Sequence, residues 1–190
     1  MDQAVQQLAA YLNQTLSPVP TVRRDAEKYL ESVEASPNYA VFLLTLIDKQ
    51  DLDMTTRIAG AIAFKNFIKR NWKIVDDALI VNKINEEDRK QVKALIVGLM
   101  LRSPEKIQRQ LSDATSIIGR EDFPNKWDNL LNELIVHIQN SGGDFTIINV
   151  SYKQRIHSSG AIVTNSNRKN YGLKSRKFSI HLLNRLLSCS

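Results

Sequence analysis

The side chains best suited to recognition chemistry lie in one apolar segment, Thr56 to Trp72. The basic and amide groups in its second half are Lys65, Asn66, Lys69 and Arg70. On a helix of 3.6 residues per turn, Lys65 and Lys69 share a face with Ile58 and Ile62, so the ammonium groups emerge from an otherwise apolar helix. A fully solvated helix face therefore does not account for these groups.

Structural explanations of the same residues stay open. Lysine stems can lie along apolar surface while their ammonium groups remain in water, and for Lys65 and Lys69 we weigh this equally with partner binding. For Asn66 we favour a polar contact between helices, because a buried amide needs hydrogen-bond partners. Trp72 and Trp127 are predicted to be core residues that close the junctions between helices, since isolated aromatic residues do not make a stacking platform for nucleic acid.

Catalytic and metal-binding patterns are missing from the sequence. It contains no G-x-x-x-x-G-K, H-E-x-x-H or G-x-S-x-G motif, and its three histidines are far apart. The acidic run Glu86-Glu87-Asp88 follows Asn85, and an N-cap side chain with negative charge on the first helical turn explains it more simply than a metal site. The sequence therefore predicts a binding protein that is not an enzyme and has no cofactor or metal.

Charge, cysteine content and hydropathy further limit the classes of protein to which this chain can belong. The net charge is +6, but residues 150–190 hold eight of the 26 basic residues and no acidic one, which leaves 18 basic against 20 acidic residues before them. A near-neutral body lacks the footprint of a specific nucleic-acid-binding protein, although the basic tail alone could bind RNA or DNA. No apolar window is long enough to span a membrane, and the single Cys189 fits a reducing compartment.

The body of the chain has the periodicity of helices throughout. Apolar stripes predict helices that begin near Val5, Val22, Tyr39, Thr56, Glu86, Glu105 and Trp127. Breaks fall at Ser17-Pro18-Val19-Pro20, Ser36-Pro37 and Phe123-Pro124, and Ser103 is expected to cap the helix that follows Pro104. Nothing in the first 140 residues alternates with period two, so the body is predicted to be all-α.

These helices are expected to form a solenoid. The connections are short, which favours antiparallel hairpins, and the second helices near Val22, Thr56 and Glu105 recur at intervals that bracket the HEAT period. The helix from Thr56 looks too apolar to have a free outer face and is expected to be covered on both sides. The predicted fold is an all-α HEAT-repeat α-solenoid followed by an irregular C-terminal tail.

With the elements in place, the body resembles the N-terminal HEAT repeats of the importin-β superfamily of nuclear transport receptors. The matching residues of the first two hairpins are Arg23, Arg24, Ala26, Glu27, Leu30, Arg57, Ala61, Lys65, Asn66 and Trp72. The phrases FKNFIKRNW, SPEKIQRQLSDA and SIIGREDFPNKW are similar to the branch of export receptors whose cargo is importin-α. The resemblance runs from Leu8 to Asn149.

The resemblance implies a function and a set of contact residues. A receptor of this branch binds the small GTPase Ran in its GTP form together with importin-α, and shuttles between nucleus and cytoplasm; the nucleotide and magnesium belong to Ran. The second helices of the hairpins would grip Ran through Arg23, Arg24, Lys28, Arg57, Lys65, Asn66 and Lys69. The alternative is a generic HEAT scaffold that holds another protein without any GTPase.

The similarity divides the chain at Asn149. Residues 1–149 are predicted to be the HEAT repeats, and residues 150–190 a basic, poorly ordered tail unlike the family. Suppose that one nucleotide is missing before the Val150 codon. With suitable synonymous codons for the tail, the restored reading frame would then encode GVLQTAHSLFRRY and a further helical hairpin like that of the family. We therefore interpret the tail as the product of a shifted reading frame, with a genuine alternative tail as the other explanation.

Overall fold

The computed structural model describes residues 2–73 and 84–140, and at 2 and 137–140 the backbone alone. The described helices are α1 (Asp2–Gln14), α2 (Pro20–Val33), α3 (Tyr39–Asp48), α4 (Met54–Asn71), α5 (Glu86–Arg102), α6 (Glu105–Asp122) and α7 (Leu130–Asn140). No strand occurs within these ranges, so the all-α prediction is confirmed. The predicted boundary at 149 and the tail 150–190 lie outside the described residues.

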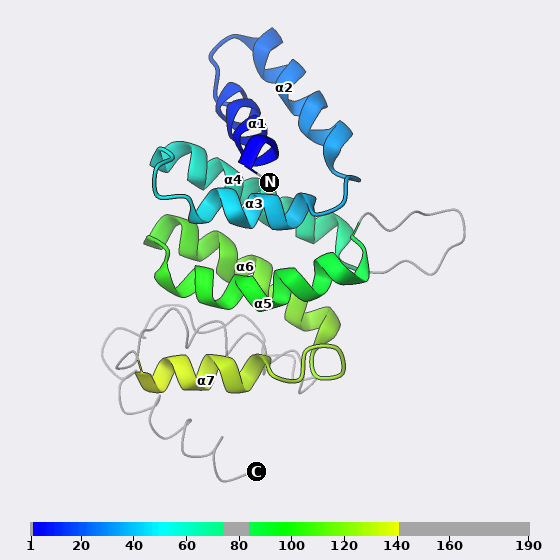
Figure 1. Ribbon diagram of the computed structural model, residues 1–190, viewed down its shortest axis with the longest axis vertical. Helices are drawn as coiled ribbons and strands as arrows, with labels where there is room; N and C mark the ends of the chain where they lie inside the picture. The colour runs from blue at the N-terminus through cyan, green and yellow to red at the C-terminus, as the bar shows by residue number, and fades with distance from the viewer. Residues whose placement is uncertain (1, 74–83, 141–190) are drawn as a thin grey trace, which may run out of the picture. The chain divides into compact units, whose positions relative to one another are not determined.

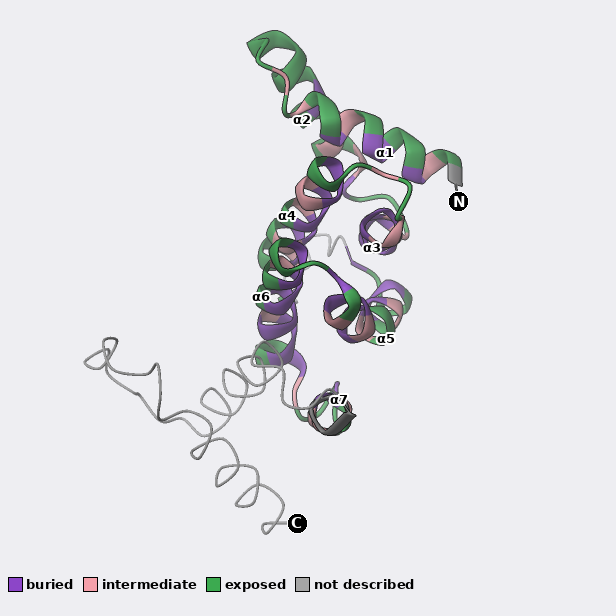
Figure 2. Ribbon diagram, turned by 90° about the vertical axis from the view of Figure 1, so that its left-hand side faces the viewer, coloured by how far each residue is buried: buried purple, intermediate pink, exposed green. Residues whose placement is uncertain are grey.

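Neighbouring helices pair into hairpins that stack on one another (Figure 1). The hairpins are α1–α2, α3–α4 and α5–α6, and α7 follows the third. Across hairpins, α3 packs against α5 and α4 packs against α6. Two layers result, with α3, α5 and α7 on one side and α4 and α6 on the other (Figure 2). Each hairpin buries its apolar faces against the next, as a solenoid requires.

Two described helices begin with a side-chain cap, and of these two caps the one at Asn85 was predicted. Asp53 caps α4, because its Oδ1 accepts a hydrogen bond from the Thr56 backbone N–H at 2.9 Å. Asn85 caps α5 in the same way, with its Oδ1 accepting from the Asp88 backbone N–H at 2.7 Å. Such side chains satisfy amides that have no partner inside the helix. The interpretation of the acidic run as a helix start is therefore confirmed.

Two predicted details at the later helix boundaries were wrong. Ser103 does not cap α6: its hydroxyl donates to the carbonyl of Leu99 at 2.7 Å and so serves the end of α5, while Pro104 holds the N-cap position of α6. The last helix begins at Leu130 rather than at Trp127. The chain between α6 and α7 turns through a cis peptide bond at Phe123-Pro124.

The core lies between the two layers. Its largest fully buried side chains are Leu43, Leu44, Leu46 and Ile47 of α3, Phe64, Phe67 and Ile68 of α4 with its C-cap residue Trp72, Ile96 and Met100 of α5, and Ile107 and Leu111 of α6. Trp127 is buried as well, so both tryptophans are core residues as predicted. Helices α3 and α4 approach closely at Gly60, where a Cβ atom would stand 2.8 Å from Leu46 Cδ2.

The first hairpin is less buried than its sequence pattern predicts. The apolar stripe expected on α2 consists of Val22, Ala26, Tyr29, Leu30 and Val33. Of these, Ala26 alone is buried, and Val22 is 39% exposed. Helix α2 packs chiefly on α1, where the Tyr11 and Tyr29 rings stack with centroids 3.6 Å apart. On α1 the buried stripe ends at Leu12, because the helix ends at Gln14 and leaves Leu16 exposed.

Candidate partner-binding face

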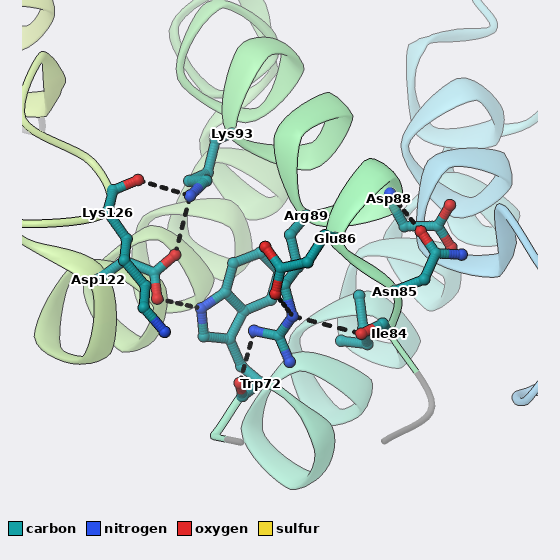
Figure 3. A network of polar contacts seen from close by, with 9 residues as sticks. All are labelled: Trp72, Ile84, Asn85, Glu86, Asp88, Arg89, Lys93, Asp122 and Lys126. Atoms are coloured by element: carbon teal, nitrogen blue, oxygen red, sulfur yellow. Dashed lines mark hydrogen bonds and ion pairs between the residues drawn. The ribbon is translucent and has the colours of Figure 1, made fainter. Parts of the chain in front are cut away.

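A buried polar clamp fixes the C-terminal end of α4 (Figure 3). The indole N–H of Trp72 donates to Oδ1 of Asp122 at 3.2 Å. The other oxygen of this carboxylate accepts from Lys93 Nζ at 3.0 Å, and Lys93 also donates to the Lys126 carbonyl at 2.7 Å. Residues of α4, α5 and α6 thus meet in one network. It gives the W of FKNFIKRNW and the D of GREDFPNKW a shared structural role.

Arg89 adds to this clamp by lying over the face of the Trp72 indole ring. Its guanidinium carbon lies 4.7 Å from the Trp72 ring centroid, and its NH1 donates to the Trp72 carbonyl at 2.7 Å. Burial lowers the pKa of Arg89, while the charges of Glu86 and Asp122 oppose that shift. Because both the ring and the carbonyl of Trp72 are held, the last turns of α4 have a fixed position.

The outer face of α4 is open, contrary to the expectation that this helix is covered on both sides. Asn66 and Lys69 are exposed, Lys65 is half-buried, and Ile62, about one turn before Lys65, is 41% exposed. Figure 2 shows exposed segments along α4. Within the described residues no hydrogen bond or ion pair engages the side chain of Lys65, Asn66 or Lys69. The predicted interhelix contact of Asn66 was therefore wrong.

Arg57, also predicted to contact the partner, lies inside the protein. Its side chain is 3% exposed, its Nε donates to the Ile47 carbonyl at 2.8 Å, and its NH1 donates to Gln50 Oε1 at 3.2 Å. The guanidinium thus ties the first turn of α4 to the end of α3. A partner on the surface cannot reach it, so Arg57 supports the face rather than lining it.

Arg23, Arg24 and Lys28 belong to α2 and form a second, separate group. All three are exposed, and Arg23 NH1 donates to the Ser17 carbonyl at 3.3 Å. Their helix also carries Asp25, Glu27 and Glu31, so its charges balance. The predicted residues thus lie on α2 and α4, the second helices of the first two hairpins.

Unbalanced positive charge distinguishes α4 from its neighbours. Its sequence has no Asp or Glu at any position. On α6 the exposed bases Lys106, Arg109 and Arg120 are mixed with Glu105, Asp113 and Glu121, and Arg109 pairs with Glu105 at 2.5 Å. The electrostatic attraction for an acidic partner thus comes mainly from α4. We call Ile62, Lys65, Asn66 and Lys69 the α4 face.

One residue beside this face makes a contact that the sequence does not reveal. Arg70 forms an ion pair with Glu34, which is 36 positions away at the end of α2. The isolated basic side chain was visible in the sequence, but its partner was not, because no local pattern links the two positions. The pair connects the α4 face to the helix that carries Arg23, Arg24 and Lys28.

The described residues offer little for a small ligand. None of their His, Cys, Asp and Glu side chains gather into a possible metal site, and none of their helices has the length and apolar character needed to cross a bilayer. A shallow groove of about 290 Å³ lies between α3 and α5, with Leu44, Leu95 and Leu99 among its lining residues and an Asp48–Arg102 ion pair at its edge. The chemistry available on the α4 face is charge recognition.

Comparison with known proteins points to one family. The importin-β N-terminal domain matches residues 26–102. Exportin-2 of Drosophila melanogaster is 57% identical over 145 residues, which are 76% of this chain and 15% of that protein. Exportin-2 of Homo sapiens is 55% identical over 148 residues, 78% of this chain and 15% of that protein. The chain therefore spans about 15% of the length of these relatives.

A solved structure shares the fold. The exportin Cse1 in its cargo-free, cytoplasmic state superposes with a TM-score of 0.65 at 28% sequence identity, covering 81% of this chain and 16% of that one. The stacked hairpins described above match this solenoid. The predicted HEAT-repeat architecture is thereby confirmed.

Proposed function

We propose that the chain binds the small GTPase Ran in its GTP form. The premise is that residues 26–102 belong to the importin-β N-terminal domain family and that the chain is similar to exportin-2. Binding would use the α4 face, with Arg23, Arg24 and Lys28 of α2 as a second group of contacts. The role is that of a nuclear export receptor, which acts by binding and not by catalysis.

The α4 face carries this proposal. Three side chains able to recognise acidic groups stand on one exposed face without described partners, on a helix that lacks acidic residues. The clamp around Trp72 and the buried Arg57 hold both ends of that helix in place. A preorganised charged surface binds with less loss of side-chain and backbone freedom than a mobile one, so it suits a specific protein partner.

Nucleotide dependence would come from Ran. The switch segments of a small GTPase are ordered by the γ-phosphate and released on hydrolysis, so a rigid surface can distinguish the two states. In the whole receptor, importin-α would be the cargo, loaded with Ran-GTP in the nucleus and released in the cytoplasm. Cooperative loading of this kind is a coupling free energy between two binding sites.

The test is retention on immobilised Ran loaded with a non-hydrolysable GTP analogue or with GDP. We expect the chain to be retained on the GTP-analogue form only. Replacing Lys65 and Lys69 by Glu should weaken binding by about 100-fold, since charge reversal both removes attraction and adds repulsion. The matched control is the double substitution of Lys90 and Lys126 by Glu, which changes the net charge equally at exposed positions outside the second helices of the hairpins. Unchanged binding of the Lys65/Lys69 variant would refute the proposal.

A generic HEAT scaffold without GTPase binding is the alternative. It would hold its partner through the same stacked hairpins, because repeat surfaces serve many unrelated partners. Equal retention on both nucleotide forms of Ran, or none on either, would favour the scaffold.

A further inference from the structure

Glu34 and Arg70 form a half-buried ion pair that joins α2 to α4. The side chain of Glu34 is 8% exposed and that of Arg70 is 55% exposed. We propose that Arg70 is a positioning residue for the partner-binding surface: through Glu34 it sets where α2, with Arg23, Arg24 and Lys28, stands relative to the α4 face. This inference rests on the proposed function.

The location of Glu34 shows why it needs this partner. Glu34 is the C-cap residue of α2, where the partial negative charge of the helix end disfavours a carboxylate. It is also buried, and a buried carboxylate requires a compensating charge. Arg70 supplies that charge from the last turn of α4, where a cation is itself favourable. The pair is thus electrostatically matched at both helix ends.

Tyr39 lies beside the pair and ties it to the core. Burial is the main cause of the raised pKa of Tyr39, Glu34 raises it further, and Arg70 opposes the shift. The Tyr39 ring packs edge-on against Phe67 of α4 with centroids 4.9 Å apart. The Glu34 carboxylate therefore lies near a ring that packs on α4, and the ion pair with Arg70 anchors the end of α2 at that place.

Helix α2 depends on such an anchor because little else holds it. Ala26 is the one residue of the helix that is buried, and α2 packs chiefly on α1 through the Tyr11–Tyr29 stack. Elements with few buried contacts open locally at low free-energy cost. Without the pair, the basic group on α2 would lose its fixed spacing from Lys65 and Lys69, and a partner that contacts both groups would bind more weakly.

The experiment is a double-mutant cycle on the whole chain, with Ran loaded with a GTP analogue as the probe. The variants are Glu34→Gln, Arg70→Gln and the double substitution, each checked for folding by thermal unfolding. We expect each single variant to bind about 3- to 10-fold more weakly and the double variant to be no weaker than the singles, because both remove the same link. Amide hydrogen exchange in residues 20–33 should rise in all three.

The direction in which Glu34→Gln changes the affinity for Ran tests whether Arg70 acts through Glu34. If Arg70 touched Ran directly, or if net charge alone mattered, removing a carboxylate beside a basic surface would leave binding unchanged or tighten it. That result would overturn the inference, as would weaker binding without faster exchange in α2. Glu31→Gln is the control, since it removes the same charge one turn earlier on α2 from an exposed position. Failure of the unchanged chain to bind would instead defeat the proposed function, and this inference with it, before any substitution is made.

Discussion

Trp72 and Asp122 meet through a hydrogen bond of 3.2 Å between the indole N–H and a buried carboxylate, although 50 positions separate them. Trp72 is the C-cap residue of α4, and Asp122 is the last residue of α6. The same carboxylate accepts from Lys93 of α5. A single side chain therefore links three helices, and the position of the α4 face depends on it.

Asp122→Ala should lower the free energy of unfolding by about 3 kcal/mol, because it leaves the Lys93 charge and the indole N–H of Trp72 without their shared acceptor. Urea titration followed by tryptophan fluorescence measures the change. The control is Glu105→Gln, which breaks the exposed Glu105–Arg109 pair and should cost less than about 0.5 kcal/mol. Equal effects of the two substitutions would show that the clamp does not hold the three helices.

Two glycines should respond in opposite directions to alanine. At Gly60 the new methyl group would stand 2.8 Å from Leu46 Cδ2, so we expect a loss of about 1 to 3 kcal/mol despite the better helix propensity of alanine. At Gly98 the nearest such atom is Arg102 NH1 at 3.4 Å, the end of a flexible side chain, and the substitution should stabilise by up to about 1 kcal/mol. Thermal unfolding of the Gly60→Ala and Gly98→Ala variants tests this expectation. A shift of the melting temperature in the same direction in both variants would contradict it.

Asp48 should contribute to stability in a way that is lost in acid. A hydrogen bond from Arg102 is the main cause that lowers the pKa of Asp48 below 3.8; burial opposes the shift, and the charges of Arg102 and Arg57 lower the pKa by smaller amounts. The folded-state pKa is thus below the unfolded one, so this stabilisation is complete above about pH 5, declines as the pH falls through the unfolded value, and disappears as the pH falls through the lower folded value.

Asp48→Asn is the variant that reveals this dependence. At pH 7 it should cost less than about 1 kcal/mol, because the Asp48–Arg102 pair is solvent-exposed and screened. The difference from the unchanged protein should shrink to nothing as the pH drops below 4. Asp53, whose pKa is lowered mainly by its hydrogen bond from the Thr56 hydroxyl, titrates in the same range and is retained in both proteins. A difference that persists undiminished at low pH would rule out a titrating carboxylate as its source.

Local sequence signals accounted for the helices but not for their long-range contacts. Asn85 specifies its own helix start because a cap acts within four residues. The prediction for Ser103 was wrong because its hydroxyl can bond either a carbonyl of the preceding helix or the amides of the following one, and tertiary packing decides between them. The stripe on α2 misled for a related reason: apolar periodicity indicates a face, but it does not say that a neighbour covers it.

The residues of the candidate site show the same difference between local signals and long-range contacts. Lys65, Asn66 and Lys69 were placed together correctly because their spacing lies within one helix. Arg57 lies on that helix too, and its type suggested a contact residue, yet its direction turns it toward the Ile47 carbonyl. The Arg70–Glu34 pair was beyond prediction, since it joins two hairpins whose packing angle no local pattern contains.

Arg57 offers the sharpest separation of structural from binding roles. Arg57→Ala should destabilise the protein by about 2 kcal/mol, because the Ile47 carbonyl and the Gln50 side chain lose a buried charged donor. Among molecules that remain folded at low temperature, affinity for GTP-bound Ran should fall far less than in the Lys69→Glu variant, since no partner reaches a side chain that is 3% exposed and only the support of the α4 face is weakened. Lys69→Glu should show the reverse: near-normal stability with weakened binding. Calorimetric titration alongside urea unfolding of both variants measures the two quantities, and a large affinity loss in folded Arg57→Ala would return this residue to the binding surface.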